Sequence, residues 1–180
     1  MDIQFLISRP VLAIAADFVK ARLRTLGVPI IDRGLPPVEA VPAIEKAPDA
    51  MGACNCHGIR IVIPSTRCGM NEIVTLCHEL AHWYDLTPNP ANLAARNAAL
   101  SRGEQWAREE YSCDPQEVTA RDVGRHCCHQ VAAAIAPMRI RRLEAEYAKV
   151  CHLTGRHTAA RKRELIQEIR FLSAHSAHSQ

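Results

Sequence analysis

The segment 71–86, NEIVTLCHELAHWYDL, constrains the fold of this chain most, because its apolar residues recur at the spacing of one amphipathic helix. At about 100° per residue, four positions fall within about 60° of Ile73 and form an apolar stripe: Leu76, Cys77, Leu80 and Tyr84. His78 and His82 project from the opposite side, one turn apart. The segment therefore predicts a helix over about 70–85 that buries one face and presents two imidazoles on the other.

The same helix carries the string His78-Glu79-x-x-His82. In this string both histidines are typical zinc ligands and the glutamate is a general base. Glu79 lies one step further round the helix, beside the expected metal, where it can take a proton from water. The alternative is a solvated helix face that happens to contain two histidines. The full string on a correctly amphipathic helix favours a zinc site.

The string LCHELAHWYD resembles the active-site helix of zincin-type metallopeptidases. Its HELAHW form resembles the ImmA/IrrE family and the metallopeptidase domain of ArdC-type antirestriction proteins. The likeness is specific over 71–86 and weaker over about 55–135. It implies an α+β, zincin-like fold, a zinc ion, and a third ligand from a glutamate in an E-x-x-A string on a later helix. The metzincin pattern does not fit, because no glycine follows at the third position after His82.

Two glutamates compete for the role of third ligand. Glu117 begins the string EVTA, which matches the E-x-x-A form. Glu110 lies in WAREEYSC, which resembles the ArdC-type string but has Cys113 where alanine is expected. Either residue would give three protein ligands and leave one position for water, as in catalytic zinc sites.

Helix geometry favours Glu117. On a helix that begins near Pro115, Glu117 shares a stripe with the small residues Ala120 and Gly124, which would let another helix come close. A carboxylate on an apolar face needs a partner, and zinc is one. The alternative is a capping box, in which Glu117 reaches back to the backbone N–H of Asp114.

The remaining sequence predicts an α+β chain with few strands early and helices afterwards. A proline-rich stretch over 33–50 indicates a loop, and residues 28–32 are a short strand candidate. Segment 52–64 predicts a β-hairpin, with turn residues at 55–58. Apolar periodicity predicts helices over 9–26, 91–111, 115–136, 138–151 and 158–173. We expect a zincin-like core over 1–136 and a helical extension over 137–180, packed on the same domain.

Composition indicates the cellular compartment that we expect for the protein. The 180 residues contain eight cysteines, yet the N-terminal segment has acidic residues and a proline where a secretion signal needs an apolar run. No stretch reaches eighteen uninterrupted apolar residues, so we expect no membrane contact and a cytoplasmic protein with reduced thiols. The net charge is only +3, but residues 139–170 hold nine Arg or Lys and four Glu.

These observations predict a zinc-dependent endopeptidase that hydrolyses a peptide bond in a protein partner, which the ImmA/IrrE likeness suggests is a regulatory protein. The strand over 59–63 could pair with an extended substrate. Tyr84 and Tyr111 are candidate oxyanion donors, and neither is assigned. The alternative function is a zincin-fold binding module with structural zinc, whose basic C-terminal helices contact nucleic acid or a protein in an antirestriction-like role.

Overall fold

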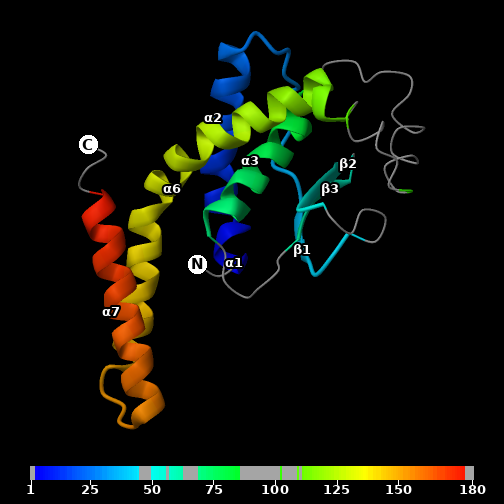
Figure 1. Cartoon of the computed structure of the whole chain (residues 1–180). Coiled ribbons are helices and arrows are strands. Elements are labelled where there is room, and N and C mark those ends of the chain that lie inside the picture. The colour runs from blue at the N-terminus through cyan, green and yellow to red at the C-terminus, as the bar shows by residue number, and fades with distance from the viewer. Residues whose placement is uncertain are drawn as a thin grey trace. The chain divides into compact units, whose positions relative to one another are not determined.

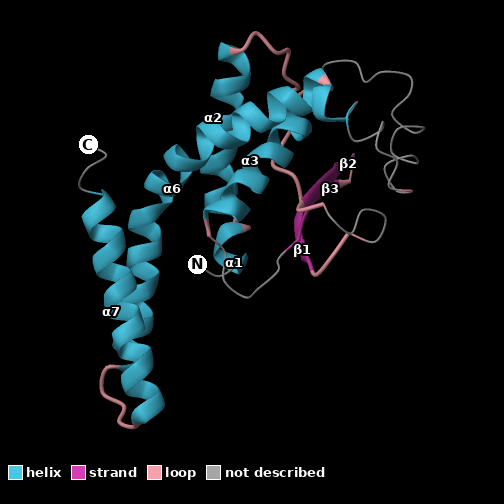
Figure 2. Ribbon diagram, viewed as in Figure 1, coloured by secondary structure: helices cyan, strands magenta, loops and turns pink. Residues whose placement is uncertain are grey.

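The computed structural model describes residues 3–44, 50–55, 57–62, 69–85, 102, 109 and 111–176. Its fold is α+β, with a small three-stranded mixed sheet and mostly helical content, as expected (Figures 1 and 2). The elements in chain order are α1 (Ile3–Leu6), α2 (Arg9–Thr25), β1 (Val38–Val41), β2 (Gly52–Asn55), β3 (Gly58–Val62), α3 (Met70–Tyr84), α6 (Pro115–Val150) and α7 (Arg156–Ser176).

The chain divides into two compact units, residues 1–131 and 132–180. The division falls inside α6, five residues before the boundary expected after residue 136. Every residue of the proposed site belongs to the first unit. The packing of the second unit on the first stays a prediction.

Helix α3 is the centre of the first unit. It packs against α2 on one side and against β2 and β3 on another (Figure 1). The predicted stripe is buried in full: Ile73, Leu76, Cys77, Leu80 and Tyr84. Helix α2 supplies the opposing apolar surface with Val11, Ala15, Val19 and Leu23. It ends before Gly27, whose φ of 71° suits a residue without a side chain. The expected helices over 9–26 and 70–85 are confirmed.

The sheet has the order β1-β3-β2. The predicted hairpin is confirmed, because β2 and β3 pair antiparallel with Cys54 opposite Ile59. Its turn is held by the side chain of Asn55, whose Oδ1 accepts hydrogen bonds from the backbone N–H groups of His57 and Gly58 at 2.8 and 3.1 Å. Because β3 lies between two strands, its edges are already paired. The expectation that this strand could pair with an extended substrate is therefore wrong for residues 59–62, and residue 63 lies outside the described residues.

The strand β1 corrects the prediction of a loop over 33–50. It pairs with β3 in parallel, with Val38 opposite Ile59. Proline lacks the N–H donor but keeps its carbonyl, so it can begin an edge strand. The carbonyl of Pro37 does this by accepting a hydrogen bond from Ile59 at 2.9 Å. The strand candidate at 28–32 instead forms a single bridge, between Ile30 and Asp85.

The two helices expected over 115–136 and 138–151 are one helix, α6, which continues through Pro137. Proline removes a single N–H from the helix, so the carbonyl of Ala133 loses its partner while the neighbouring turns continue. The expected segment 91–111 lies outside the described residues except for 102, 109 and 111. Among the described helices, none combines the length and apolar character needed to cross a membrane.

Candidate metal centre

The two histidines of α3 face each other across one helical turn. Their ring centroids are 4.8 Å apart, their planes meet at 81°, and their Nε2 atoms are 3.2 Å apart. The side chains are 17% and 21% exposed for His78 and His82. Two ring nitrogens thus converge on one point at the edge of the core, where an ion can still enter.

Glu117 reaches the same point from the first turn of α6. Its Oε2 is 3.4 Å from Nε2 of His78, and its Oε1 is 3.3 Å from Nε2 of His82. The carboxylate is buried, whereas both imidazoles are partly exposed. Within the described parts of the chain, these three side chains form the one group whose ligand atoms all lie within 4.8 Å of one another. The structure therefore brings together the three residues predicted as metal ligands.

The two imidazole nitrogens and the carboxylate lie close enough to share one ion. Zinc binds nitrogen and oxygen at about 2.0–2.1 Å, so neighbouring corners of its tetrahedron lie roughly 3.3–3.4 Å apart. The two Nε2 atoms are 3.2 Å apart, and each lies 3.3–3.4 Å from a different oxygen of Glu117. With one ligand atom taken from each residue, all three lie within 4.8 Å of one another. Charge-assisted hydrogen bonds between imidazole and carboxylate would be shorter, at about 2.7–2.9 Å.

One oxygen of the buried carboxylate is unsatisfied. Oε2 of Glu117 is buried and has no hydrogen-bond partner among the described residues. A cation bound by the two imidazole nitrogens and this carboxylate would satisfy it.

The capping-box alternative for Glu117 is realised only in part. Asp114 caps α6, because its Oδ1 accepts hydrogen bonds from the N–H groups of Gln116 and Glu117 at 2.9 and 3.3 Å. The reciprocal half of the box would take the N–H of Asp114, which donates to the carbonyl of Tyr111 at 3.3 Å. The cap is therefore made by Asp114, and the carboxylate of Glu117 lies at the imidazoles instead.

Glu79 lies beside the group formed by His78, His82 and Glu117 without belonging to it. Its Oε1 is 4.0 Å from Nε2 of His78, and its side chain is only 7% exposed. Burial raises the pKa of Glu79 to about 7, with His78 opposing the rise and Glu117 adding to it. Burial would also raise the pKa of Glu117, but the facing imidazoles outweigh it and hold that pKa well below its ordinary value. The pKa values of the two carboxylates are thus shifted in opposite directions. The carboxylate of Glu117 is suited to hold a cation, and that of Glu79 is suited to take up a proton near neutral pH.

Two glycines bring the neighbouring elements against α3. A Cβ at Gly52 of β2 would lie 2.6 Å from Oε1 of Glu79 and 2.7 Å from Cγ2 of Thr75. A Cβ at Gly124 of α6 would lie 3.0 Å from the carbonyl oxygen of Val74 and 3.4 Å from Cβ of His78. β2 therefore covers the flank of α3 that carries Glu79, and α6 covers the flank that carries His78.

Two further residues near the site were missed by sequence reasoning. Arg121 joins the turn at 111–113 to α6, because its Nε donates to the carbonyl of Glu117 and its Nη2 donates to the carbonyl of Ser112. Gly52 makes room for Glu79. Tyr111 contributes to the lowered pKa of the Glu117 carboxyl and stays unassigned as an oxyanion donor. The competing ligand Glu110 lies outside the described residues.

Tyr84, the other candidate oxyanion donor, lies away from the site. Its ring is buried in the core stripe of α3, with the ammonium group of Lys20 4.5 Å from the ring centroid. Its hydroxyl has no hydrogen-bond partner among the described residues. Tyr84 is therefore a core residue.

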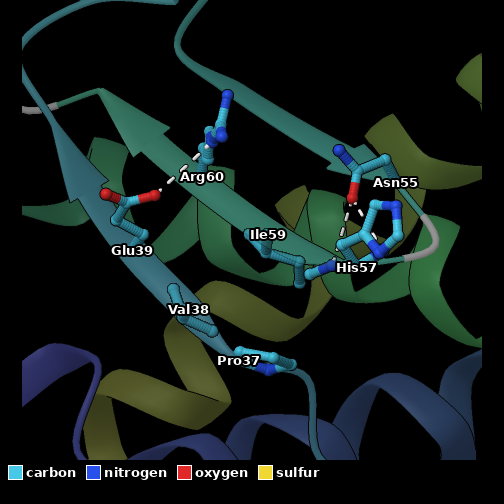
Figure 3. Close-up of a pocket in the computed structure, with 8 residues that line it drawn as sticks. Pro37, Val38, Glu39, Asn55, His57, Ile59 and Arg60 are labelled. Carbon is cyan, nitrogen blue, oxygen red and sulfur yellow. Dashed lines mark hydrogen bonds and ion pairs between the residues drawn. The ribbon is translucent and has the colours of Figure 1, made fainter.

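A surface hollow of about 360 Å³ lies at the start of β1 and the hairpin turn (Figure 3). Its lining includes Asn55, His57 and the ion pair of Glu39 and Arg60, whose Oε2 and Nε are 3.5 Å apart. None of the three candidate ligands nor Glu79 lines it. The hollow is separate from the candidate metal centre.

No family model, curated protein or solved structure matches this chain.

Proposed function

We propose that this protein is a zinc-dependent metallo-endopeptidase that hydrolyses a peptide bond in a protein partner. One observation carries the proposal: the Nε2 atoms of His78 and His82 lie 3.2 Å apart and each lies 3.3–3.4 Å from an oxygen of Glu117, and the buried carboxylate of Glu79 adjoins this group. This arrangement supplies three metal ligands and a separate base, which a purely structural zinc site does not need.

The chemistry divides between the ligands and Glu79. His78, His82 and Glu117 would hold the zinc ion, which would supply a Lewis acid for polarising a carbonyl and for making water easier to deprotonate. Glu79 accepts the proton of the attacking water, because its carboxylate lies beside the ligands and burial favours its protonated form. Glu79 then gives that proton to the leaving amine as the peptide bond breaks. The backbone of Gly52 limits where the carboxylate can move.

The proposal extends to a zincin-like fold and to a cytoplasmic setting. The likeness of the α3 segment to zincin active-site helices supports the first, together with the packing of α3 between the sheet and α6. Five described cysteines, Cys77, Cys113, Cys127, Cys128 and Cys151, are free thiols, which supports a reducing compartment. The suggestion that the substrate is a regulatory protein rests on the ImmA/IrrE likeness.

The alternative is a binding module with structural zinc that contacts nucleic acid or a protein partner. The observation in its favour is on α7, where Arg156, Arg163 and Arg170 are exposed and recur every seventh residue along one side. Glu79 separates the two proposals, because a binding module has no use for a base beside its metal.

The deciding experiment compares the wild type with Glu79→Gln. Zinc content is measured by elemental analysis, and cleavage is measured by mass spectrometry of a cell-lysate proteome. We expect one zinc per chain in both proteins and a loss of cleavage of about 10²–10⁴-fold or more in the variant, the usual contribution of a general base.

A matched control is Glu144→Gln, which changes an exposed glutamate of the second unit in the same way. It should retain both zinc and cleavage. Equal cleavage by wild type and Glu79→Gln would remove Glu79 from the mechanism and leave the binding module as the better proposal.

A further inference from the structure

His82 lies close to the end of its helix, whereas His78 lies a full turn further inside. Helix α3 ends at Tyr84, so His82 belongs to its last turn. The last four carbonyl groups of a helix have no partner within the helix, and a terminal turn frays when nothing else holds it. A metal ligand in such a turn therefore keeps its direction only if the turn is held from outside the helix.

The guanidinium of Arg33 holds this turn. It donates to the backbone carbonyl of Trp83 through both Nε, at 2.6 Å, and Nη2. The same guanidinium lies over the ring of Trp83, 3.8 Å from the ring centroid, which is the distance of a cation–π contact. Its positive charge also complements the negative end of the helix dipole. One side chain thus contacts both the backbone and the ring of the residue that follows His82.

The backbone around Arg33 completes the attachment. The indole Nε1 of Trp83 donates to the carbonyl of Gly34 at 3.0 Å, and the backbone N–H of Ile31 donates to the carbonyl of Tyr84 at 2.9 Å. Trp83 is buried, while Arg33 is half-buried above it. The last two carbonyl groups of α3 therefore both have partners in segment 31–33, and the indole binds the next residue of the same segment.

We propose that Arg33 is a positioning residue for the metal ligand His82: it holds the last turn of α3 in the conformation that directs this imidazole toward His78 and Glu117. The inference rests on the proposed function in one respect, namely that His82 binds the metal. Arg33 acts through the backbone of Trp83 and is neither a ligand nor the base. Residues that orient metal ligands in this indirect way typically change metal affinity by about 10–100-fold.

The first test is a double-mutant cycle in zinc affinity. Arg33→Ala is made in the wild-type chain and in His82→Ala, and zinc dissociation constants are measured by competition with a chromophoric chelator. We expect Arg33→Ala to weaken zinc binding by about 10–100-fold in the wild-type chain, and to cause no further loss in His82→Ala. Arg24→Ala, which removes an exposed arginine of α2, is the matched control and should leave zinc affinity unchanged in both backgrounds.

A conservative variant checks that the shape of the guanidinium matters. Arg33→Lys keeps the positive charge but loses the planar fork that makes two hydrogen bonds and stacks on a ring. We expect its zinc affinity to lie between those of the wild type and Arg33→Ala. If Arg33→Ala does not fold, the cycle is carried out with Arg33→Lys.

Amide hydrogen exchange separates positioning from general support of the fold. Exchange is followed by mass spectrometry on the zinc-free chain, and Arg33→Ala should speed it over residues 80–85 but not over 70–76. Equal weakening of zinc binding in both backgrounds, unchanged zinc binding in the wild-type background, or equally faster exchange along all of α3 overturns the positioning role. A wild-type protein that binds no zinc overturns the proposed function instead, while the exchange result still shows whether Arg33 holds the last turn.

Discussion

At the scale of single residues, the site depends on two buried carboxylates whose surroundings differ. Glu117 faces two imidazoles, which lower its pKa despite its burial. Glu79 is buried against the backbone of β2, and its pKa is raised to about 7. Pairs of carboxyl groups with pKa values pushed apart are typical of sites where one group stays ionised and the other carries a proton. The residue type alone therefore does not decide the role of either glutamate.

Glu117→Ala should lose zinc while α6 remains folded, because Asp114 and not Glu117 makes the helix cap. The expected loss of zinc affinity exceeds the roughly 10–100-fold that is typical of an outer partner. The matched variant Asp114→Ala should show the reverse: it should keep zinc and lose about 1 kcal/mol of stability. Zinc titration and thermal melting of both proteins, beside Glu110→Ala, make the comparison. Loss of zinc in Glu110→Ala alone would assign the third ligand to Glu110.

At the scale of secondary-structure elements, two glycines set how closely β2 and α6 approach α3. Replacing glycine by alanine inside a helix normally stabilises it by about 1 kcal/mol. At Gly124 the added Cβ would lie 3.0 Å from the backbone oxygen of Val74, which cannot move without its helix. The glycine therefore serves the close packing of α6, from which Glu117 projects.

Gly124→Ala should destabilise the protein by roughly 1–3 kcal/mol, the usual cost of overpacking, and weaken zinc binding as α6 moves away. Gly52→Ala should have a different result: zinc is retained and cleavage falls, because the new Cβ displaces Glu79 and not a ligand. Gly34→Ala is the control, since a Cβ there meets no atom within 4 Å. Zinc titration, cleavage rate and chemical denaturation are measured on all three. Normal zinc binding in Gly124→Ala would show that the helix pair tolerates the shift.

At the scale of the whole molecule, the candidate ligands join α3 to α6 within the first unit, while the second unit has contacts of its own. In that unit Glu146 accepts a hydrogen bond from Nε of Arg161 at 3.0 Å, and Arg139 pairs with Glu168. A ligand stabilises only the structure that must be formed to bind it. Zinc should therefore act on the two units unequally.

Zinc at about 100 times its dissociation constant should add about 2.7 kcal/mol to the stability of the structure that binds it. We expect slower amide hydrogen exchange in α3 and the first turns of α6, and little change in α7. Exchange is followed by mass spectrometry with zinc and with a chelator, and His82→Ala is the control that should show no zinc effect. Equal protection of α7 would indicate that the two units unfold together.

The sequence by itself determined the local features of this protein. The 3.6-residue period of 71–86 places the core stripe and the two imidazoles on opposite sides of one helix, because side-chain direction within a helix follows from spacing alone. The hairpin was predictable for a similar reason, since Asn55 and Gly58 supply its turn chemistry within four residues. The start of α6 at Pro115 and its cap at Asp114 were predictable from the same short-range rules, whereas the expected end at residue 136 was wrong.

The tertiary structure decided what no local rule contains. β1 is a strand only because β3 offers it a parallel partner, and Pro137 stays inside α6 because a helix can lose one hydrogen bond and continue. Glu117 is a candidate metal ligand and not only a capping residue, because α6 lies close enough to α3 for its carboxylate to reach both imidazoles. Gly52 likewise gains its role from a contact between elements distant in the chain. Such contacts are selected by the packing of the whole unit, which the spacing of residues along one segment does not encode.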